Sequence, residues 1–473
     1  MQPYAPLGTL YAAAVLRQAG MDVALFDPMF SSSEEELASA IRMHRPHIVV
    51  IYDDSFNYLT KMCLERMRNA AFRMIEISNR SGCQVVVSSS DASDHPRQYL
   101  EQGADYLVVG EGEMTLRELC SGLLSGKAID SELIDGVSLL SNGMFIQARS
   151  RPPVRDLDLF PFPAWDLVDV DTYRRMWSRH GYFSMNIVTT RGCPFGCNWC
   201  AKPIYGRGYN SRSPDNVVDE IEWLKEVYRP DHLWFCDDIF GLKPGWIERF
   251  SEEISRRNVK INYKCLSRPD LLLKENSFGW LARSGCRAVW IGAESGDQRV
   301  LDAMEKGTTV DQIREATRRL KERGIKVGYF LQFGYPGEKY DMIKETLALV
   351  HDEMPDEIGI SVSYPLPGTK FHQKVKNRIG SKRNWYDSDD LALLFPGEFR
   401  PDFYVALHRF AHHRHRLRKI MSGGEPLTPR TMAAFAFNLM RLPYSALMLR
   451  LKRRRNPERF DFLDEISHSL SER

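Results

Sequence analysis

The chain has 473 residues, of which 43% are hydrophobic and 27% charged, with 64 basic and 62 acidic side chains. This length is too great for one ordinary hydrophobic core and predicts two or three domains. The near-neutral charge excludes recruitment of nucleic acid or membrane by a global electrostatic field, so any such contact needs a local patch. Nine cysteines, an odd number with three clustered, favour a reducing cytoplasm over a disulfide framework.

Residues 1–150 alternate short apolar strands with helical segments. The strands are predicted over residues 47–52, 84–90 and 105–110. Because they are apolar throughout, we expect a doubly wound parallel sheet covered by helices on both faces. A capping box of Ser33 and Glu36 is predicted to open one of these helices. Sheets of this kind bind ligands at the carboxyl ends of their strands.

The chain opens with a loop and a helix that ends at Gly20. A doubly wound sheet normally has a strand before this helix, so we expect either a start upstream of Met1 or a domain that has lost its first strand. The motif Gly-Glu-Gly-Glu at residues 110–113 leads into a later helix. It fits a glycine turn whose acidic side chains favour the helix N-terminus, or a part of the ligand-binding edge.

Residues 151–180 combine prolines with acidic breaks and are predicted to form an ordered linker. Residues 181–384 then repeat strand and helix six times, which predicts a partial (β/α)6 barrel. The strands are expected over residues 185–190, 232–237, 261–267, 288–294, 326–334 and 357–364. Ser213 and Pro214 are predicted to cap and begin a helix with one apolar face. In such barrels the chemistry lies at the carboxyl ends of the strands.

Three cysteines, Cys193, Cys197 and Cys200, directly follow the first barrel strand. A structural zinc site needs four ligands, so zinc would require a distant partner such as His180 or another cysteine. Three thiolates can instead hold a cubane iron-sulfur cluster and leave one iron open. The spacing favours the cluster over zinc, and also over a redox pair, which needs only two cysteines.

This cysteine loop resembles the signature of the radical S-adenosylmethionine (SAM) superfamily. The resemblance implies that the three cysteines hold a four-iron, four-sulfur cluster (4Fe-4S), whose open iron binds the amino and carboxylate groups of SAM. It also implies reductive cleavage of SAM to a 5′-deoxyadenosyl radical, with electrons from an external donor such as flavodoxin or ferredoxin. Trp199, before the last cysteine, matches an aromatic that the family often places against the adenine; simple packing is the alternative role.

Loops after later strands match the same family in order. The resemblance places Asp237 and Asp238 near the SAM ammonium group, although one of them could cap the next helix instead. It assigns Glu294 and Ser295, which follow the fourth strand, to the position that contacts the ribose. Each loop taken alone is an ordinary turn, and the resemblance depends on their order along the chain.

Gly334 and Gly337 follow the fifth strand and match the glycines that allow close approach of the backbone to the adenine. Arg268 is a candidate ligand of the SAM carboxylate or of an anionic substrate, with a structural role as the alternative.

An α/β domain ahead of such a barrel resembles the cobalamin-binding class of radical SAM enzymes, over residues 1 to about 400. The class implies a corrinoid at the carboxyl edge of the sheet. Many members pass a methyl group from SAM to cobalt and then to an unactivated carbon, and others catalyse cyclisations or oxidations. The loop at residues 88–96 lacks the Asp-x-His-x-x-Gly arrangement that ligates cobalt in the classical domain, and His95 is expected to be a surface residue. Cobalamin binding without this ligand and a vestigial domain both stay open.

From residue 385 the sequence is helical and basic, and it resembles the extension of proteins similar to anaerobic magnesium-protoporphyrin monomethyl ester cyclase. This resemblance indicates membership of a subfamily but does not indicate the substrate. Four histidines at 408, 412, 413 and 415 are expected on a solvated basic helix rather than in a metal site. The apolar stretch at residues 431–455 is expected to pack on the barrel or to lie in a membrane interface, and Arg441 and Pro443 are expected to interrupt it.

The sequence therefore predicts a cobalamin-type domain at residues 1–150, the linker at 151–180, a radical SAM barrel at 181–384 and a helical extension at 385–473. The leading function is cobalamin-dependent methylation, or a related tailoring reaction, of a small or lipid-like molecule in the cytoplasm. Peripheral membrane contact through the C-terminal helix is an option, and no nucleic-acid partner is expected. The alternative is a radical SAM rearrangement, cyclisation or elimination without functional cobalamin. A remote third is a structural zinc module of a binding protein.

Overall fold

The computed structural model describes residues 2–56, 64–126, 134–202, 204–274, 276–387, 390–423, 428–457 and 459. Their strands form a five-stranded sheet, a six-stranded sheet and a two-stranded ribbon. The chain separates into two units, the first made of Met1–Pro194, Ala201–Lys264 and Asn384–Asp387, and the second of Phe195–Cys200, Cys265–Arg383 and Ser388–Arg473. The domain limits expected at residues 150, 180 and 384 stay predictions.

The five-stranded sheet has the order β1-β2-β3-β4-β5. Its strands are β1 (Ile48–Tyr52), β2 (Gln84–Ser88), β3 (Tyr106–Val108), β4 (Val137–Ser141) and β5 (Met144–Gln147). The first three are parallel, which confirms the predicted parallel sheet. β4 and β5 are antiparallel additions that we did not expect. They form a hairpin through Asn142 and Gly143, whose positive φ angles of 50° and 76° suit a tight two-residue turn.

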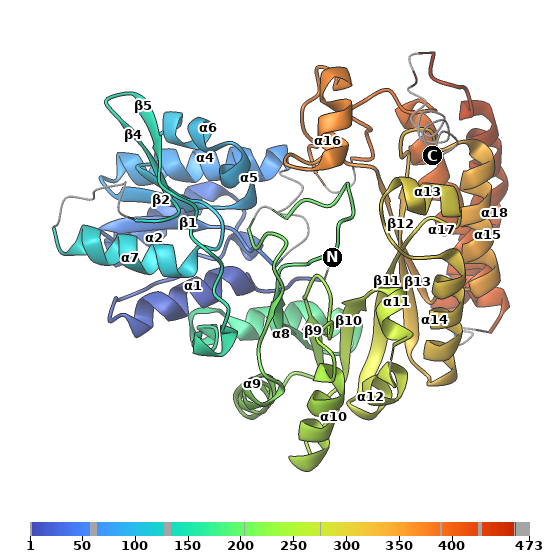
Figure 1. Cartoon of the computed structure of the whole chain (residues 1–473), viewed down its shortest axis with the longest axis horizontal. Helices are drawn as coiled ribbons and strands as arrows, with labels where there is room; N and C mark the ends of the chain where they lie inside the picture. Colours follow the sequence, from blue (N-terminus) through green and yellow to red (C-terminus); the bar gives the residue numbers. More distant parts are fainter. Residues whose placement is uncertain are drawn as a thin grey trace, which may run out of the picture. The chain divides into compact units, whose positions relative to one another are not determined.

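Helices cover both faces of this sheet, as Figure 1 shows. One face carries α1 (Leu7–Gln18) and α7 (Glu113–Leu124), and the other carries α4 (Glu65–Arg80), α5 (Ser90–Asp94) and α6 (Pro96–Glu101). The pleat divides β2 between two cores, because Val86 packs with α1 and α7 while Val85 and Val87 pack with α4 and α6. The doubly wound arrangement is therefore confirmed.

The predicted capping box before α2 (Leu37–His44) is wrong in detail. Ser33 accepts from the backbone N–H of Glu35, and Glu36 instead accepts from the N–H and hydroxyl of Ser32. The segment therefore begins as a short 3₁₀ turn. Such turns occur at Pro28–Phe30, Glu34–Glu36, Leu157–Leu159, Trp165–Leu167, Ser178–His180 and Lys376–Arg378.

The six-stranded sheet has the order β13-β12-β11-β10-β9-β6. Its strands are β6 (Ser184–Ile187), β9 (His232–Phe235), β10 (Tyr263–Ser267), β11 (Cys286–Glu294), β12 (Lys326–Phe333) and β13 (Glu357–Val362). The pairs β6/β9, β9/β10, β11/β12 and β12/β13 are parallel. This half-barrel confirms the predicted partial barrel.

Helices precede and connect these strands. They are α8 (Val170–Trp177), α9 (Pro214–Val227), α10 (Trp246–Arg256), α11 (Pro269–Leu272), α12 (Ser277–Arg283), α13 (Gln298–Ala303), α14 (Val310–Glu322), α15 (Tyr340–Glu353) and α16 (Lys370–Val375). The predicted start of α9 is confirmed, because the Ser213 hydroxyl accepts from the N–H of Asn216 at 3.1 Å and Pro214 is the first helical residue.

Two long helices, α17 (Pro401–Met421) and α18 (Pro429–Lys452), end the described chain and lie side by side (Figure 1). The expectation that Arg441 and Pro443 interrupt the second one is wrong, because α18 continues through Pro443. By length and composition alone α18 could cross a membrane, and 17% of its apolar window is buried.

The histidines of α17 are more enclosed than the sequence indicated. His415 is buried, with Nε2 at 2.7 Å from the Pro355 carbonyl, and burial lowers the pKa of His412 to about 4. Within the part of the chain that the structure describes, they belong to no group of three or more ligand side chains that could hold a metal ion. The helix is thus packed rather than solvated.

Candidate functional site

The cysteine loop begins at β7 (Thr190–Arg191), which pairs with β8 (Asn210–Ser211) and closes the loop at its base. Gly192 has φ of 83°, and a side chain there would collide with the carbonyl of Gly208. Cys193 is buried, Cys197 and Cys200 are half-buried, and none of the three forms a disulfide. Cys193 belongs to the first unit, and Cys197 and Cys200 belong to the second.

Two cations surround Cys197 within the second unit. The Arg268 guanidinium is 3.8 Å from Cys197 Sγ and 3.7 Å from the centre of the Phe195 ring. Arg268 Nη2 also donates to the Lys306 carbonyl at 2.8 Å, and Asp270 accepts from its Nε at 2.9 Å. Positive charge and N–H donors near a sulfur ligand stabilise its negative charge. Arg268 therefore lies beside a predicted cluster ligand.

Glu294 ends β11 in the left-handed conformation, with φ of 59°, at an irregularity in the strand register. Such a conformation costs about 1–3 kcal/mol for a non-glycine residue. Its Oε1 accepts from Lys306 Nζ at 2.8 Å, and both side chains are buried. Burial lowers the pKa of Lys306, but the charges of Glu294 and Cys197 and the hydrogen bond to Glu294 together outweigh burial, so the pKa is raised. Trp199 lies close by, with its ring centre 6.0 Å from Lys306 Nζ.

The loops after β11 and β12 use their polar groups internally. The hydroxyls of Ser295 and Thr346 are 3.0 Å apart, within hydrogen-bond distance. Gly334, with φ of 79°, donates its N–H to Glu338 Oε2 at 2.6 Å, and Gly337 has φ of 85°. Burial raises the pKa of Glu338 to about 8, so this carboxyl keeps its proton at neutral pH. The predicted glycines thus form a tight, buried turn.

Asp237 is buried after β9, and its carboxylate is fully engaged inside the first unit. One oxygen accepts from the N–H groups of Thr189 and Thr190, and the other from the Thr189 hydroxyl, all at 2.7 Å. Burial raises its pKa to about 6. Asp237 therefore fixes the residues just before the cysteine loop, whereas its neighbour Asp238 is exposed.

Arg191 connects the start of the cysteine loop to the Gly-Glu-Gly-Glu motif. Its guanidinium pairs with Glu111 and, at 2.7 Å, with Glu113, and all three side chains are buried. The rings of Tyr11, Phe56, Phe160 and Tyr205 lie 4.2–5.7 Å from the guanidinium carbon. Burial raises the pKa of Glu111, and Arg191 opposes this shift. The acidic motif is thus part of a buried ion triad.

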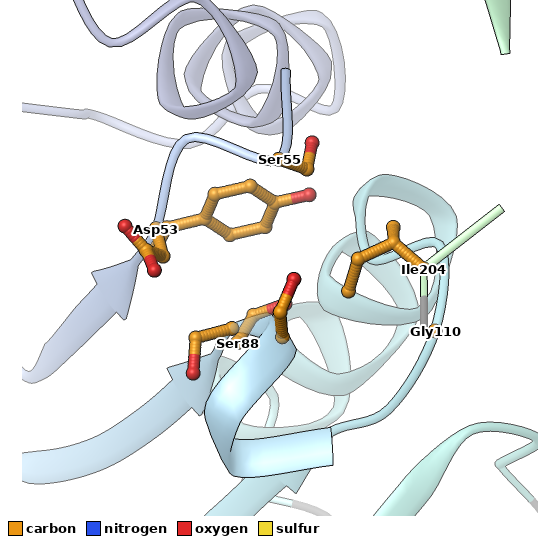
Figure 2. Close-up of a pocket in the computed structure, with 8 residues that line it drawn as sticks. Asp53, Ser55, Ser88, Gly110 and Ile204 are labelled. Atoms are coloured by element: carbon orange, nitrogen blue, oxygen red, sulfur yellow. The ribbon is translucent and has the colours of Figure 1, made fainter. Parts of the chain in front are cut away.

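Small polar residues gather at the carboxyl ends of β1, β2 and β3 (Figure 2). They line a narrow cavity of about 10 Å³ that is bounded by Tyr52, Asp53, Ser55, Ser88, Ser89, Ser90, Gly110 and Ile204. The Ser90 hydroxyl is buried and has no hydrogen-bond partner among the described residues. Burial, followed by the charge of Asp54, raises the pKa of Asp53 to about 7. Small side chains and an unpartnered hydroxyl suit the approach of a large polar ligand to the backbone.

No histidine lines this cavity. His95 lies between α5 and α6, partly exposed, with Nε2 at 3.8 Å from Asp91 Oδ1. Burial lowers its pKa.

The roles of Arg191, Lys306 and Asn198 were not predicted from the sequence. Asn198 lies inside the cysteine motif, and its Nδ2 donates to the Ala303 carbonyl at 2.7 Å. Each of these contacts joins residues far apart in the chain, so local spacing gives no signal for them. The one usable signal was that charged residues inside apolar motifs need partners of opposite charge.

Removal of Arg191 tests the ion triad. We expect Arg191→Met to destabilise the first unit by about 3–5 kcal/mol, because it leaves two buried carboxylates without a cation. Glu111, whose folded pKa is raised by burial, then holds a proton that the unfolded chain releases. Stability of the variant should therefore fall further, relative to the parent, from about pH 5 to about pH 8. Thermal unfolding across this range measures both effects.

The matched control is Arg318→Met, which removes exposed pairs with Glu315 and Glu322. Exposed pairs contribute about 0–1 kcal/mol, so its unfolding temperature should change little. Equal destabilisation by the two variants would contradict a dominant role for the Arg191 triad.

Two regions of the chain match known protein families. Residues 187–350 match the Radical SAM superfamily, and residues 2–120 match the B12 binding domain. Among solved structures, the radical SAM methyltransferase TsrM from Kitasatospora setae, with cobalamin and a [4Fe-4S] cluster bound, superposes with a TM-score of 0.66 at 21% identity, over 80% of this chain and 76% of that one. The cobalamin-dependent radical enzyme OxsB superposes with a TM-score of 0.73 at 18% identity, over 95% and 70%. These likenesses concern the fold.

Three relatives have a named activity or enzyme class. An uncharacterized methyltransferase of Pyrococcus horikoshii is 26% identical over 80% of this chain and 80% of its own length. The hopanoid C-3 methylase of Methylococcus capsulatus is 27% identical over 85% and 75%. The anaerobic magnesium-protoporphyrin IX monomethyl ester cyclase of Rubrivivax gelatinosus is 26% identical over 58% of this chain and half of that protein.

The matched domains confirm the resemblance found in the sequence. A radical SAM domain implies a 4Fe-4S cluster and SAM, and a B12-binding domain implies cobalamin. The chain is therefore a radical SAM enzyme with a B12-binding domain in its N-terminal region.

Proposed function

We propose that this enzyme is a cobalamin-dependent methylase, or a related tailoring enzyme, that acts on a small or lipid-like molecule. The observation that carries the proposal is the pairing of the two domains in one chain, together with alignments that include 75–80% of two methyltransferase-type relatives. The alignment with the cyclase covers half of that relative, so it is weaker support for the alternative reaction.

In this proposal Cys193, Cys197 and Cys200 hold the cluster. The donor set fits, because three thiolates can hold a cubane cluster and none of the three cysteines is in a disulfide. When bound, such a cluster supplies the electron for reductive cleavage of SAM. Arg268 lies beside Cys197 and the charge of Lys306 also acts on this thiol, so both place positive charge near a proposed cluster ligand.

Trp199, Glu294 and the backbone at Gly334 and Gly337 are proposed to seat SAM. Lys306 holds the Glu294 carboxylate in its strained conformation and so orients it before any ligand arrives. Asp237 supports the chain that leads into the cysteine loop, and Ser295 supports the loop after β11, since their oxygens are engaged within the protein. Exposed Asp238 is the better placed of the two aspartates to meet the SAM ammonium group.

Cobalamin is proposed to lie at the carboxyl edge formed by Ser88, Ser89, Ser90 and Gly110. When bound, it supplies a cobalt centre that carries a methyl group between SAM and substrate. Ser90 offers its unpartnered hydroxyl there. Because no histidine lines the edge, the protein is expected to give cobalt no imidazole ligand at this site.

The proposed location and electron donor follow from the same assignment. We propose a cytoplasmic enzyme that receives electrons from flavodoxin or ferredoxin.

The α18 surface supports peripheral membrane contact, because it exposes large apolar side chains next to a basic end. These are Met432, Phe437, Leu439, Met440, Tyr444, Leu447 and Leu451. Arg450 and Lys452 lie in the last turn of the helix, and Arg453, Arg454 and Arg455 follow it.

A second candidate is a radical cyclisation, rearrangement or elimination without methyl transfer. The relatives that favour it are the cyclases, which are 25–26% identical and are covered over 50–62% of their length.

Cofactor content and label transfer distinguish the two candidates. The protein is purified without oxygen from cells supplied with cobalamin, and its corrinoid, iron and zinc are measured. We expect near-equimolar corrinoid, about four iron atoms per chain, and transfer of a deuterated methyl group from SAM to an acceptor in host extract. Cluster-dependent SAM cleavage without corrinoid would favour the second candidate. Zinc without iron would exclude both.

Arg268→Gln tests the environment of the cluster. We expect the variant to have a more negative cluster reduction potential, because it loses a positive charge and an N–H donor 3.8 Å from Cys197 Sγ. A redox titration followed by electron paramagnetic resonance measures the potential. Arg283→Gln is the control, since Arg283 is exposed and stacks on Trp280. An unchanged potential in Arg268→Gln would refute the assigned role.

Vesicle flotation tests the membrane contact. The protein should float with anionic vesicles and bind more weakly to neutral ones, because apolar insertion and basic residues act together. Met440→Glu should reduce flotation, while Arg430→Gln, in the first turn of α18 and far from its basic end, should change it less. Protein that stays at the bottom with anionic vesicles would exclude this contact.

A further inference from the structure

The strands β11, β12 and β13 carry helices on one face and present a second, inner face. Helices α12 and α14 pack against β11, and α14 also packs against β12 (Figure 1). On β12 the buried Tyr329 identifies the helix-covered side, because its hydroxyl lies 2.5 Å from that of Thr317 in α14. Since side chains alternate along a strand, Gly328, Phe330 and Gln332 belong to the inner face.

Two aromatic side chains lie next to each other on this inner face. The ring centres of Trp290 in β11 and Phe330 in β12 are 4.7 Å apart, with planes inclined by 33°. Trp290 is half-buried and Phe330 is 40% exposed, although the strand neighbours Tyr329 and Leu331 are buried. A pair of accessible aromatic rings in the middle of a sheet is an apolar surface that can receive a ligand. We call Trp290 and Phe330 the aromatic floor.

Glycines in the two neighbouring strands keep the aromatic floor flat. Trp290 pairs in register with Gly328, and a Cβ atom at Gly328 would collide with the indole ring. A Cβ atom at Gly359 of β13 would lie 3.3 Å from Trp290 Cζ3 and 3.5 Å from Phe330 Cδ1. The indole ring therefore lies across β12 towards β13, over positions that have no side chain. The result is a broad apolar surface without ridges.

Polar groups of the inner face lie at the carboxyl end of the strands. Gln332 pairs in register with Ser361, and Ser363 directly follows β13. Gln332 is 1% exposed, and its Oε1 atom has no hydrogen-bond partner in the part of the chain that the structure describes. The buried hydroxyl of Ser363 has none there either. Buried polar atoms without partners are costly, so a ligand that donates a hydrogen bond to Gln332 would remove a penalty.

The inner face around the aromatic floor has no ionisable side chain at six central positions. These are Ala288, Trp290, Gly328, Phe330, Gly359 and Ser361. Lys306 Nζ lies over Gly292 at the carboxyl end, but it is already paired with Glu294 Oε1 at 2.8 Å. A phosphate or carboxylate group placed on the floor would lose water without gaining a cation. The surface therefore suits a neutral molecule.

We propose that Trp290, Phe330 and Gln332 select a neutral substrate with a flat, fused-ring system and a hydrogen-bond donor at one end. The rings lie on the aromatic floor, and the donor is accepted by Gln332 Oε1. A single extended chain would cover only part of two adjacent aromatic rings, whereas fused rings cover both. The inference rests on the proposed function, because Glu294, at the carboxyl end of β11, is among the residues proposed to seat SAM.

Two pyrene probes test this selection. 1-Hydroxypyrene is flat, is neutral at pH 7 and carries one O–H donor, whereas 1-methoxypyrene has the same rings without the donor. Their dissociation constants are measured at pH 7 by equilibrium dialysis against the cluster-loaded protein, without oxygen. We expect 1-hydroxypyrene to bind about tenfold more tightly, because one hydrogen bond to a buried acceptor distinguishes the two probes.

Variants of the inner face locate the probe. Gln332→Leu should abolish the difference between the two probes, and it is expected to fold because it removes an unpartnered amide. Ser361→Ala is the matched control and should preserve the difference, because the Ser361 hydroxyl already donates to the Leu331 carbonyl at 3.4 Å. Phe330→Ala should weaken both probes about tenfold. Phe437→Ala should change neither, since Phe437 is similarly exposed, at 49%, but lies on α18.

Several results would overturn the proposal. One is a parent protein that binds neither probe, or that binds 1-dodecanol as tightly as 1-hydroxypyrene. Another is an undiminished preference for 1-hydroxypyrene in Gln332→Leu. A third is weaker binding in Phe437→Ala but not in Phe330→Ala, which would place the probes on α18. Probe binding requires no corrinoid, SAM cleavage or methyl transfer, so a failure here is distinguishable from a failure of the proposed function.

Discussion

The burial of one charge governs how this enzyme is assembled. Arg191 lies among aromatic rings and away from water, where an unpaired guanidinium would cost several kcal/mol, so Glu111 and Glu113 must be in place to neutralise it. These glutamates enter α7 of the B12-binding region, and Arg191 stands two residues before Cys193. The packing of α7 is thereby coupled to the position of Cys193, the first of the proposed cluster ligands.

Polar and charged side chains with fixed partners also surround the cysteine loop. Asp237 holds the two threonines that precede the loop, and Arg268 and Lys306 hold its second half next to Cys197. Lys306 is then shared with Glu294, a residue kept in a left-handed conformation. Polar groups with fixed partners pre-organise the loop, which reduces the rearrangement needed when a cofactor binds.

Much of the fold was accessible from the sequence because its elements have strong local patterns. Parallel strands that are buried on both faces are continuous apolar runs, and this pattern located β2 and the six strands of the half-barrel. The hairpin of β4 and β5 was missed even though Asn142-Gly143 is a strong short-range turn signal. The path of α18 through Pro443 could not be read from propensity, because an exposed helix tolerates a cost of about 3 kcal/mol when its neighbours compensate.

The candidate site was less predictable, for a different reason. The cysteine spacing is local and distinctive, whereas the partners of Arg191 are 78 and 80 residues away and that of Lys306 is 12 residues away. Such pairings depend on tertiary structure. Asp237 illustrates the limit well: its place after β9 was predicted, but its three hydrogen bonds to the chain before the cysteine loop follow only from the fold.

The open side of β1 also bears on how the protein behaves in the laboratory. A sheet edge whose apolar residues keep free N–H and C=O groups is a template for strands of other molecules. The protein is therefore prone to edge-to-edge association at high concentration. A peptide strand that pairs with β1 would be a more direct remedy than altering the surface, because it removes the template itself.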